Sequence, residues 1–174
     1  MSSLNKGIDK VEVTLRWDPS PLGAAPHDLD IVAATYTADA PYGEPAYLVH
    51  FDSRSPDGTI TLNRDSQNGQ GFGSDEVMTL ELGRLAPNYT RVVVGVAIQQ
   101  GEGHKTFGEI ANPAVRIREG YEELSQSDFT GVAPATAATV AEFARGEAGE
   151  WHHKVVLRGY DGASEEFTSV MGRA

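Results

Sequence analysis

The sequence contains no cysteine, no long apolar run and few basic residues for its number of acids. The missing thiols exclude disulfides, thiolate metal sites and cysteine nucleophiles. With 14 basic against 25 acidic residues, the net charge of -11 argues against a nucleic-acid partner. No stretch approaches the roughly 20 apolar residues of a membrane span, and the first ten residues include no apolar signal segment. We therefore expect a cytoplasmic protein without a transmembrane segment.

The 174 residues are enough for one domain of ordinary size. A chain of this length buries about two-thirds of its unfolded surface, so it forms a core without disulfides. We expect a single sandwich domain over residues 1–174.

Short β-rich segments separated by turn residues dominate the chain. Residues 10–17 alternate strictly, which places Val11, Val13, Leu15 and Trp17 on one buried face. The same criteria predict strands over residues 30–36, 47–51, 59–63, 77–82, 91–99 and 115–118.

Turn residues indicate how these strands are connected. Residues 55–58, Ser-Pro-Asp-Gly, predict a hairpin between the strands over 47–51 and 59–63. The strand over 115–118 is expected to pair with a weaker segment around Phe129. Because no amphipathic helices separate the strands, the pattern indicates an all-β antiparallel sandwich or barrel.

Two C-terminal segments are less regular. Residues 133–145 combine alanines that favour a helix with threonines that favour a strand, and both readings stay open from composition. Residues 163–171 predict a short C-terminal helix, because Ser164 precedes Glu165 and Glu166 in what would be the first turn.

The most informative segment is the glycine-rich stretch over residues 63–76, N-R-D-S-Q-N-G-Q-G-F-G-S-D-E. Its glycines, at positions 69, 71 and 73, disfavour a regular element and let backbone carbonyls turn inward. Oxygen-bearing side chains surround them, and oxygen is the donor that Ca²⁺ prefers. The alternative is an ordinary surface turn between two strands.

A pair of acids earlier in the chain supports the metal interpretation. Asp28 and Asp30 flank Leu29, and residues two apart in an extended segment point to the same side. Together with the loop they can supply the six to eight oxygens of a calcium site. The predicted ligands are Asp28, Asp30, Asp65, Ser66, Asn68, Gly71, Asp75 and Glu76.

Other metal and catalytic patterns fit less well. The loop is not an EF-hand, because Gln70 stands where that motif needs glycine, and it lacks the ending of a phosphate loop. The five histidines show no metal-ligand spacing, and no nucleophile elbow is present. We expect no enzymatic activity.

Several motifs in one order carry a family resemblance. R-W-D-P, D-L-D, S-P-D-G, R-D-S-Q-N-G-Q-G-F-G-S-D-E-V, T-F-G-E-I and G-E-W-H-H-K-V-V-L-R-G-Y run between residues 16 and 160. The chain thereby resembles the TerD family of bacterial tellurium-resistance and stress proteins. The resemblance implies a cytoplasmic, non-enzymatic β-sandwich that binds Ca²⁺ through the D-L-D segment and the glycine loop. It also implies that residues 133–145 form a strand paired with residues 150–157.

The loop departs from the family pattern, which usually reads G-D-N-x-T-G-E-G-D-G-D-D-E. Here Ser66 replaces the asparagine, and Gln70, Phe72 and Ser74 stand at acidic positions. Since calcium affinity depends on ligand charge, we expect weaker binding or the loss of one of two sites. Asp52 replaces a family asparagine and adds one charge.

The resulting hypothesis is a calcium-binding stress-response protein whose loops order around the ion and present a surface to other stress-response proteins. One alternative is a calcium-dependent carbohydrate-binding or adhesion module. The other is a metal-dependent hydrolase that uses the same carboxylates.

Overall fold

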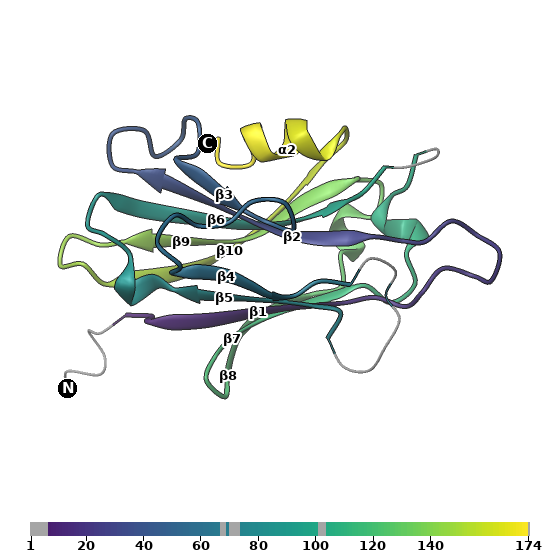
Figure 1. Ribbon diagram of the computed structural model, residues 1–174, viewed down its shortest axis with the longest axis horizontal. Helices are drawn as coiled ribbons and strands as arrows, with labels where there is room; N and C mark the ends of the chain where they lie inside the picture. Colours follow the sequence, from purple (N-terminus) through teal and green to yellow (C-terminus); the bar gives the residue numbers. More distant parts are fainter. Residues whose placement is uncertain (1–6, 67–68, 70–73, 101–103, 174) are drawn as a thin grey trace.

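The computed structural model describes residues 7–66, 69, 74–100 and 104–173. Two antiparallel sheets of five strands face each other, in the orders β4-β5-β1-β7-β8 and β10-β9-β6-β2-β3 (Figure 1). One short helix, α2, lies on the outer face of the second sheet, so the predicted all-β sandwich with a C-terminal helix is confirmed. The elements are β1 Lys10–Arg16, β2 Leu29–Thr37, β3 Tyr47–Val49, β4 Ile60–Arg64, β5 Glu76–Glu81, β6 Tyr89–Ile98, β7 Ala114–Glu119, β8 Glu122–Ser127, β9 Ala137–Arg145, β10 Trp151–Tyr160 and α2 Ser164–Val170.

The main core lies between the two sheets. β1 contributes Val11, Val13 and Leu15 to it, all fully buried, while the alternate residues face outward as the sequence predicts. β6 is buried over eight consecutive residues because α2 and the C-terminus cover its outer face. Phe167 and Met171 provide that cover, which explains why β6 reads as one continuous apolar run.

The predicted hairpin across residues 55–58 is wrong. β3 pairs with β2 and β4 pairs with β5, so the two strands belong to opposite sheets. Turn composition predicts a reversal of the chain but not the partner of the strand that follows. Here the reversal carries the chain from one sheet to the other.

The predicted pairing of the seventh strand with the segment around Phe129 is also wrong. β7 pairs with β8, a polar edge strand of sequence EELSQS that carries little hydrophobic signal. Phe129 itself has a left-handed backbone, with φ 65°, and stacks on Phe107 in the core at a centroid distance of 4.4 Å.

The strand interpretation of the alanine-rich segment is confirmed. β9 and β10 form a hairpin, and β9 also pairs with β6. Its alanines are buried on both faces: Ala138 and Ala141 pack in the main core, and Ala137 packs in the cluster beneath α2. α2 confirms the predicted terminal helix. In the described part of the chain, no helix has the length and apolar character that crossing a membrane would require.

Arg91 joins the outer face of the second sheet to the C-terminus. Its guanidinium, only 9% exposed, donates to the carbonyls of Pro41 and Gly172 at 2.8 and 2.6 Å and pairs with Glu142 at 3.2 Å. The Tyr42 ring lies 4.7 Å from it, measured to the ring centroid. One buried cation therefore holds three segments together.

Replacing Arg91 tests this role. Arg91→Met should lower the free energy of unfolding by about 2 to 4 kcal/mol, because two carbonyls and the Glu142 carboxylate lose a buried partner. Arg84→Met is the control, since the Arg84 side chain is 64% exposed and, among the described residues, forms an ion pair only with Glu81; its cost should be about 0 to 1 kcal/mol. Urea denaturation measures both, and equal losses would contradict the role.

Candidate metal centre

The first residues of β2 form an incompletely paired edge. β2 pairs with β6 along its length, but β3 covers only residues 33–35 on the other side. The Ile31 N–H therefore has no strand partner, and it donates to Oε1 of Glu76 at 2.9 Å. Glu76 begins β5 in the opposite sheet and is fully buried. A carboxylate from one sheet thus closes the open edge of the other.

Three acids meet at this edge. One ligand oxygen from each of Asp28, Asp30 and Glu76 lies within 4.8 Å of the others. Asp30 is 2% exposed and Asp28 is half-buried. Gln99, at the end of β6, donates to Oδ2 of Asp30 at 2.5 Å. We call Asp28, Asp30 and Glu76 the acidic centre.

Two oxygens of the acidic centre are buried without a hydrogen-bond donor from the described residues: Oδ1 of Asp28 and Oε2 of Glu76. Within the described part of the chain, no lysine or arginine forms an ion pair with any of the three acids. A buried polar atom without a partner carries a desolvation penalty, which a bound cation would relieve.

Burial and like charge act together on these acids. Burial, and next the Asp30 carboxylate, raise the pKa of Asp28 to about 7. The same two causes raise the pKa of Glu76 to about 11. Burial also raises the pKa of Asp30, against the effect of the Gln99 hydrogen bond. The centre therefore disfavours three negative charges unless a positive charge compensates them.

Asp65, at the start of the glycine loop, acts on the acidic centre through its charge. That carboxylate is exposed, yet its charge contributes to the raised pKa of each of the three acids. Of the other predicted ligands, Asn68 and Gly71 lie outside the described residues. Ser66 accepts the Gly69 N–H at 3.1 Å.

Asp75 is directed elsewhere. Its Oδ2 accepts the Trp17 N–H at 2.8 Å, and its own N–H donates to the Leu15 carbonyl at 2.8 Å. These two hydrogen bonds continue the pairing of β1 with β5 by one residue. The structure therefore places Asp75 outside the acidic centre, as a residue that positions Trp17.

Trp17 connects the loop to the start of β2. It is 1% exposed, and its indole N–H donates to the carbonyl of His27 at 2.8 Å, directly before Asp28. Gly69 packs on the same ring with φ +78°, where a Cβ would lie 2.5 Å from Nε1. Trp17, which the sequence predicts as a core residue, thus also positions the glycine loop and the start of β2.

The sequence reasoning missed Gln99 as a partner of Asp30. Its position, one residue beyond a long buried run, is the only local signal. The antiparallel register, with Leu29 opposite Ile98, is what brings it to the start of β2.

Comparisons with known proteins agree with this architecture. Residues 1–169 match the family model described as TerD domain. The tellurium resistance protein TerD of Serratia marcescens is 25% identical over 167 residues, covering 93% of this chain and 86% of that protein. The protein TerX of the same organism is 29% identical, covering 82% of this chain and 74% of its own length.

Solved structures are similar over nearly the whole chain. The crystal structure of the unknown-function protein SAV2460 is 59% identical with a TM-score of 0.95, covering 97% of this chain and 99% of that one. A homologue of the telluride resistance protein (TerD), SCO6318 from Streptomyces coelicolor A3(2), is 54% identical with a TM-score of 0.94 and the same coverage.

Fold and site define an all-β sandwich protein with a buried acidic centre at one sheet edge. The match over residues 1–169 then assigns the particular family: the chain belongs to the TerD domain family.

Gly69 offers a direct test of the loop packing. Gly69→Ala should lower the free energy of unfolding by about 2 to 4 kcal/mol. The added methyl group would clash with the Trp17 ring, and alanine would also have to adopt a left-handed backbone conformation. Gly58→Ala isolates the backbone cost, because φ is +73° there and nothing lies within 4 Å of the added Cβ; we expect about 1 to 2 kcal/mol. Chemical denaturation followed by tryptophan fluorescence compares the two. Equal losses would show that the packing on Trp17 contributes nothing.

Proposed function

We propose that this protein is a non-enzymatic calcium-binding stress-response protein in which the acidic centre holds the ion. One observation carries the proposal: three carboxylates lie close together, and two of their buried oxygens accept no hydrogen bond from the described residues. Both oxygens can serve a cation as ligands. Without a cation, the Asp30 and Glu76 carboxyls can share a proton, and a bound ion would replace that proton.

The donor set fits calcium. Ca²⁺ binds oxygen at about 2.3 to 2.6 Å, so two oxygens on one ion lie at most about 5 Å apart. The separations within 4.8 Å satisfy that limit. All three side chains offer oxygen, which suits a hard cation better than a thiophilic metal. Asp28, Asp30 and Glu76 would hold the ion, and Asp65 would add charge from the loop.

The surrounding residues favour a structural role for the ion. Asp30 and Glu76 are 2% and 0% exposed, so an ion held between their carboxylates would be largely enclosed by protein. Trp17 contacts Gly69 and the carbonyl of His27, so an ion at the centre would be linked to the glycine loop through a buried ring. We propose that the ordered loops form the surface that meets a protein partner.

The relatives add the biological context. Proteins of similar sequence are named for tellurium resistance, and another relative, from Clostridium acetobutylicum, is named chemical-damaging agent resistance protein B. These names support a role in resistance to chemical stress for this chain as well.

Calcium addition tests the proposal. In chelator-stripped protein, calcium at 100 times its dissociation constant should stabilise the fold by about 2.7 kcal/mol, because it binds only the folded state. For a domain of this size that corresponds to a rise in Tm of about 5 to 10 °C. Differential scanning calorimetry over a calcium titration provides the measurement. A Tm that stays constant up to millimolar calcium would refute calcium binding.

A charge-neutral variant locates the ion. Glu76→Gln keeps the volume and the oxygen that accepts the Ile31 N–H but removes the negative charge. Its Tm without calcium should equal or exceed that of the wild type, and the calcium-dependent rise should disappear. Glu81→Gln makes the same change on the same strand, outside the acidic centre, and should keep the full rise. A Glu76→Gln protein that still responds to calcium would place the site elsewhere.

A further inference from the structure

A second feature lies beside the acidic centre, on the outer face of the second sheet. It is a pocket of about 170 Å³ between β2, the end of β6, the turn after β3 and α2. A cavity on the order of 150 Å³ accommodates a benzene molecule. The pocket therefore has room for one small group.

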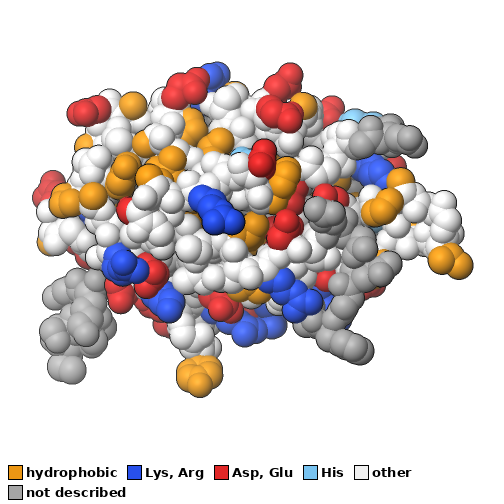
Figure 2. Space-filling view, viewed as in Figure 1, with side chains coloured by type: hydrophobic (Ala, Val, Ile, Leu, Met, Phe, Trp, Pro, Cys, Tyr) orange, Lys and Arg blue, Asp and Glu red, His pale blue; other side chains and the backbone are white. Residues whose placement is uncertain are grey.

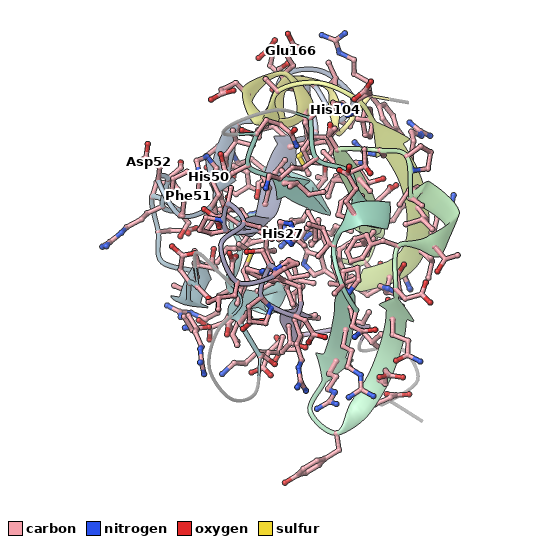
Figure 3. The ribbon with its side chains drawn as sticks, turned by 90° about the vertical axis from the view of Figure 1, so that its right-hand side faces the viewer. His27, His50, Phe51, Asp52, His104 and Glu166 are labelled. Atoms are coloured by element: carbon pink, nitrogen blue, oxygen red, sulfur yellow. The ribbon has the colours of Figure 1, made fainter. Side chains whose placement is uncertain are left out.

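The pocket has an apolar floor and an aromatic wall. Val32 and Ala97 form the floor, and Phe51 stands at the side with 51% of its surface exposed. Figure 3 shows His50, Phe51 and Asp52 close together at the left side of the molecule. The face of an exposed aromatic ring beside a small pocket can bind a cation through a cation–π interaction.

The polar lining combines acids with the neutral side chains of Gln99, Ser164 and Thr168. Asp30 lies at the inner end, and Asp52 and Glu165 are exposed residues of the lining. Neither Asp52 nor Glu165 forms an ion pair within the described residues, and no lysine or arginine is among the residues that line the pocket. Figure 2 shows acidic side chains gathered over α2, at the top of that view. Two uncompensated negative charges thus face an apolar pocket.

The histidine of the lining does not compensate them. Nδ1 of His50 accepts the Asp52 N–H at 3.1 Å, and a ring nitrogen that accepts a hydrogen bond carries no proton. In this arrangement the imidazole is neutral. It contributes a polar edge to the pocket without adding positive charge.

The turn that carries Phe51 and Asp52 is held in place. His50 and Ser53 exchange two backbone hydrogen bonds at 2.9 and 3.1 Å, and the Ser53 hydroxyl donates to the Leu48 carbonyl at 2.7 Å. The backbone that carries Phe51 and Asp52 is therefore held in place before any ligand arrives, which lowers the entropic cost of binding.

From this combination we propose that the pocket binds an aliphatic ammonium or guanidinium group. The cation lies between Asp52 and Glu165 and against the Phe51 ring, and the methylene chain covers Val32 and Ala97. Both carboxylates lie outside the acidic centre, so the proposal does not depend on calcium binding. The group can belong to a free small molecule or to an arginine or lysine side chain of a protein.

Butylguanidinium and butylurea form a matched pair of probes, since they differ mainly in charge. In protein kept in millimolar calcium, butylguanidinium should shift the NMR resonances of Phe51 and Thr168 saturably, with a millimolar dissociation constant. Butylurea should not. A blocked Ala-Arg-Ala peptide tests the protein source: tighter binding than butylguanidinium assigns the pocket to a side chain, and weaker binding assigns it to a free small molecule.

Variants locate the binding. Glu165→Gln and Asp52→Asn should each weaken butylguanidinium about two- to fivefold, the range expected for exposed ion pairs. Phe51→Leu should weaken it to a similar degree. Glu166→Gln is the control. Glu166 follows Glu165 on α2 but lies outside the pocket lining and, in Figure 3, apart from His50, Phe51 and Asp52. This variant should leave the affinity for butylguanidinium unchanged.

Three results would overturn the proposal: equal binding of butylurea, equal effects of Glu165→Gln and Glu166→Gln, or shifts confined to Asp28 and Glu76. The last result would place the cation in the acidic centre. A failure of calcium to raise the Tm would leave the Glu165 comparison unaffected, so the two proposals fail separately.

Discussion

The short length of β3 is the constraint on which the acidic centre depends. β3 ends before it reaches the start of β2, so the Ile31 N–H has no partner within its own sheet. A buried donor without an acceptor is costly, and Glu76 supplies the acceptor from the opposite sheet. The bond brings the Glu76 carboxylate to the start of β2, beside Asp28 and Asp30. The geometry of one strand edge thus gathers three acids.

Trp17 connects the edge of β2 to the glycine loop. The ring touches Gly69 and donates to the carbonyl before Asp28, while the backbone N–H of the same residue is held by Asp75. Loop, strand and acidic centre are therefore joined through one buried side chain. Asp30 has a comparable position, since it belongs to the acidic centre and also ends the pocket beneath α2. The two proposed binding regions, the acidic centre and the pocket, therefore meet at a single carboxylate.

Much of the fold was predictable because the signals are local. The alternation in β1 predicted its buried face, and the apolar segment over residues 91–99 predicted a strand; both predictions were confirmed. The hairpin across residues 55–58 was not, because a turn specifies that the chain reverses and not which strand receives it. β8 was missed because an edge strand needs few apolar residues.

The sequence by itself determined the class of fold, the family and the pairing of Asp28 with Asp30, since two acids separated by one buried residue must share a face of a strand. Only the tertiary structure decided that Glu76 joins them, that Asp75 turns to Trp17 instead, and that Gln99 contacts Asp30. The reason is physical: these contacts depend on the register between strands and on the approach of two sheets. Neither quantity is encoded in the spacing of residues along one segment.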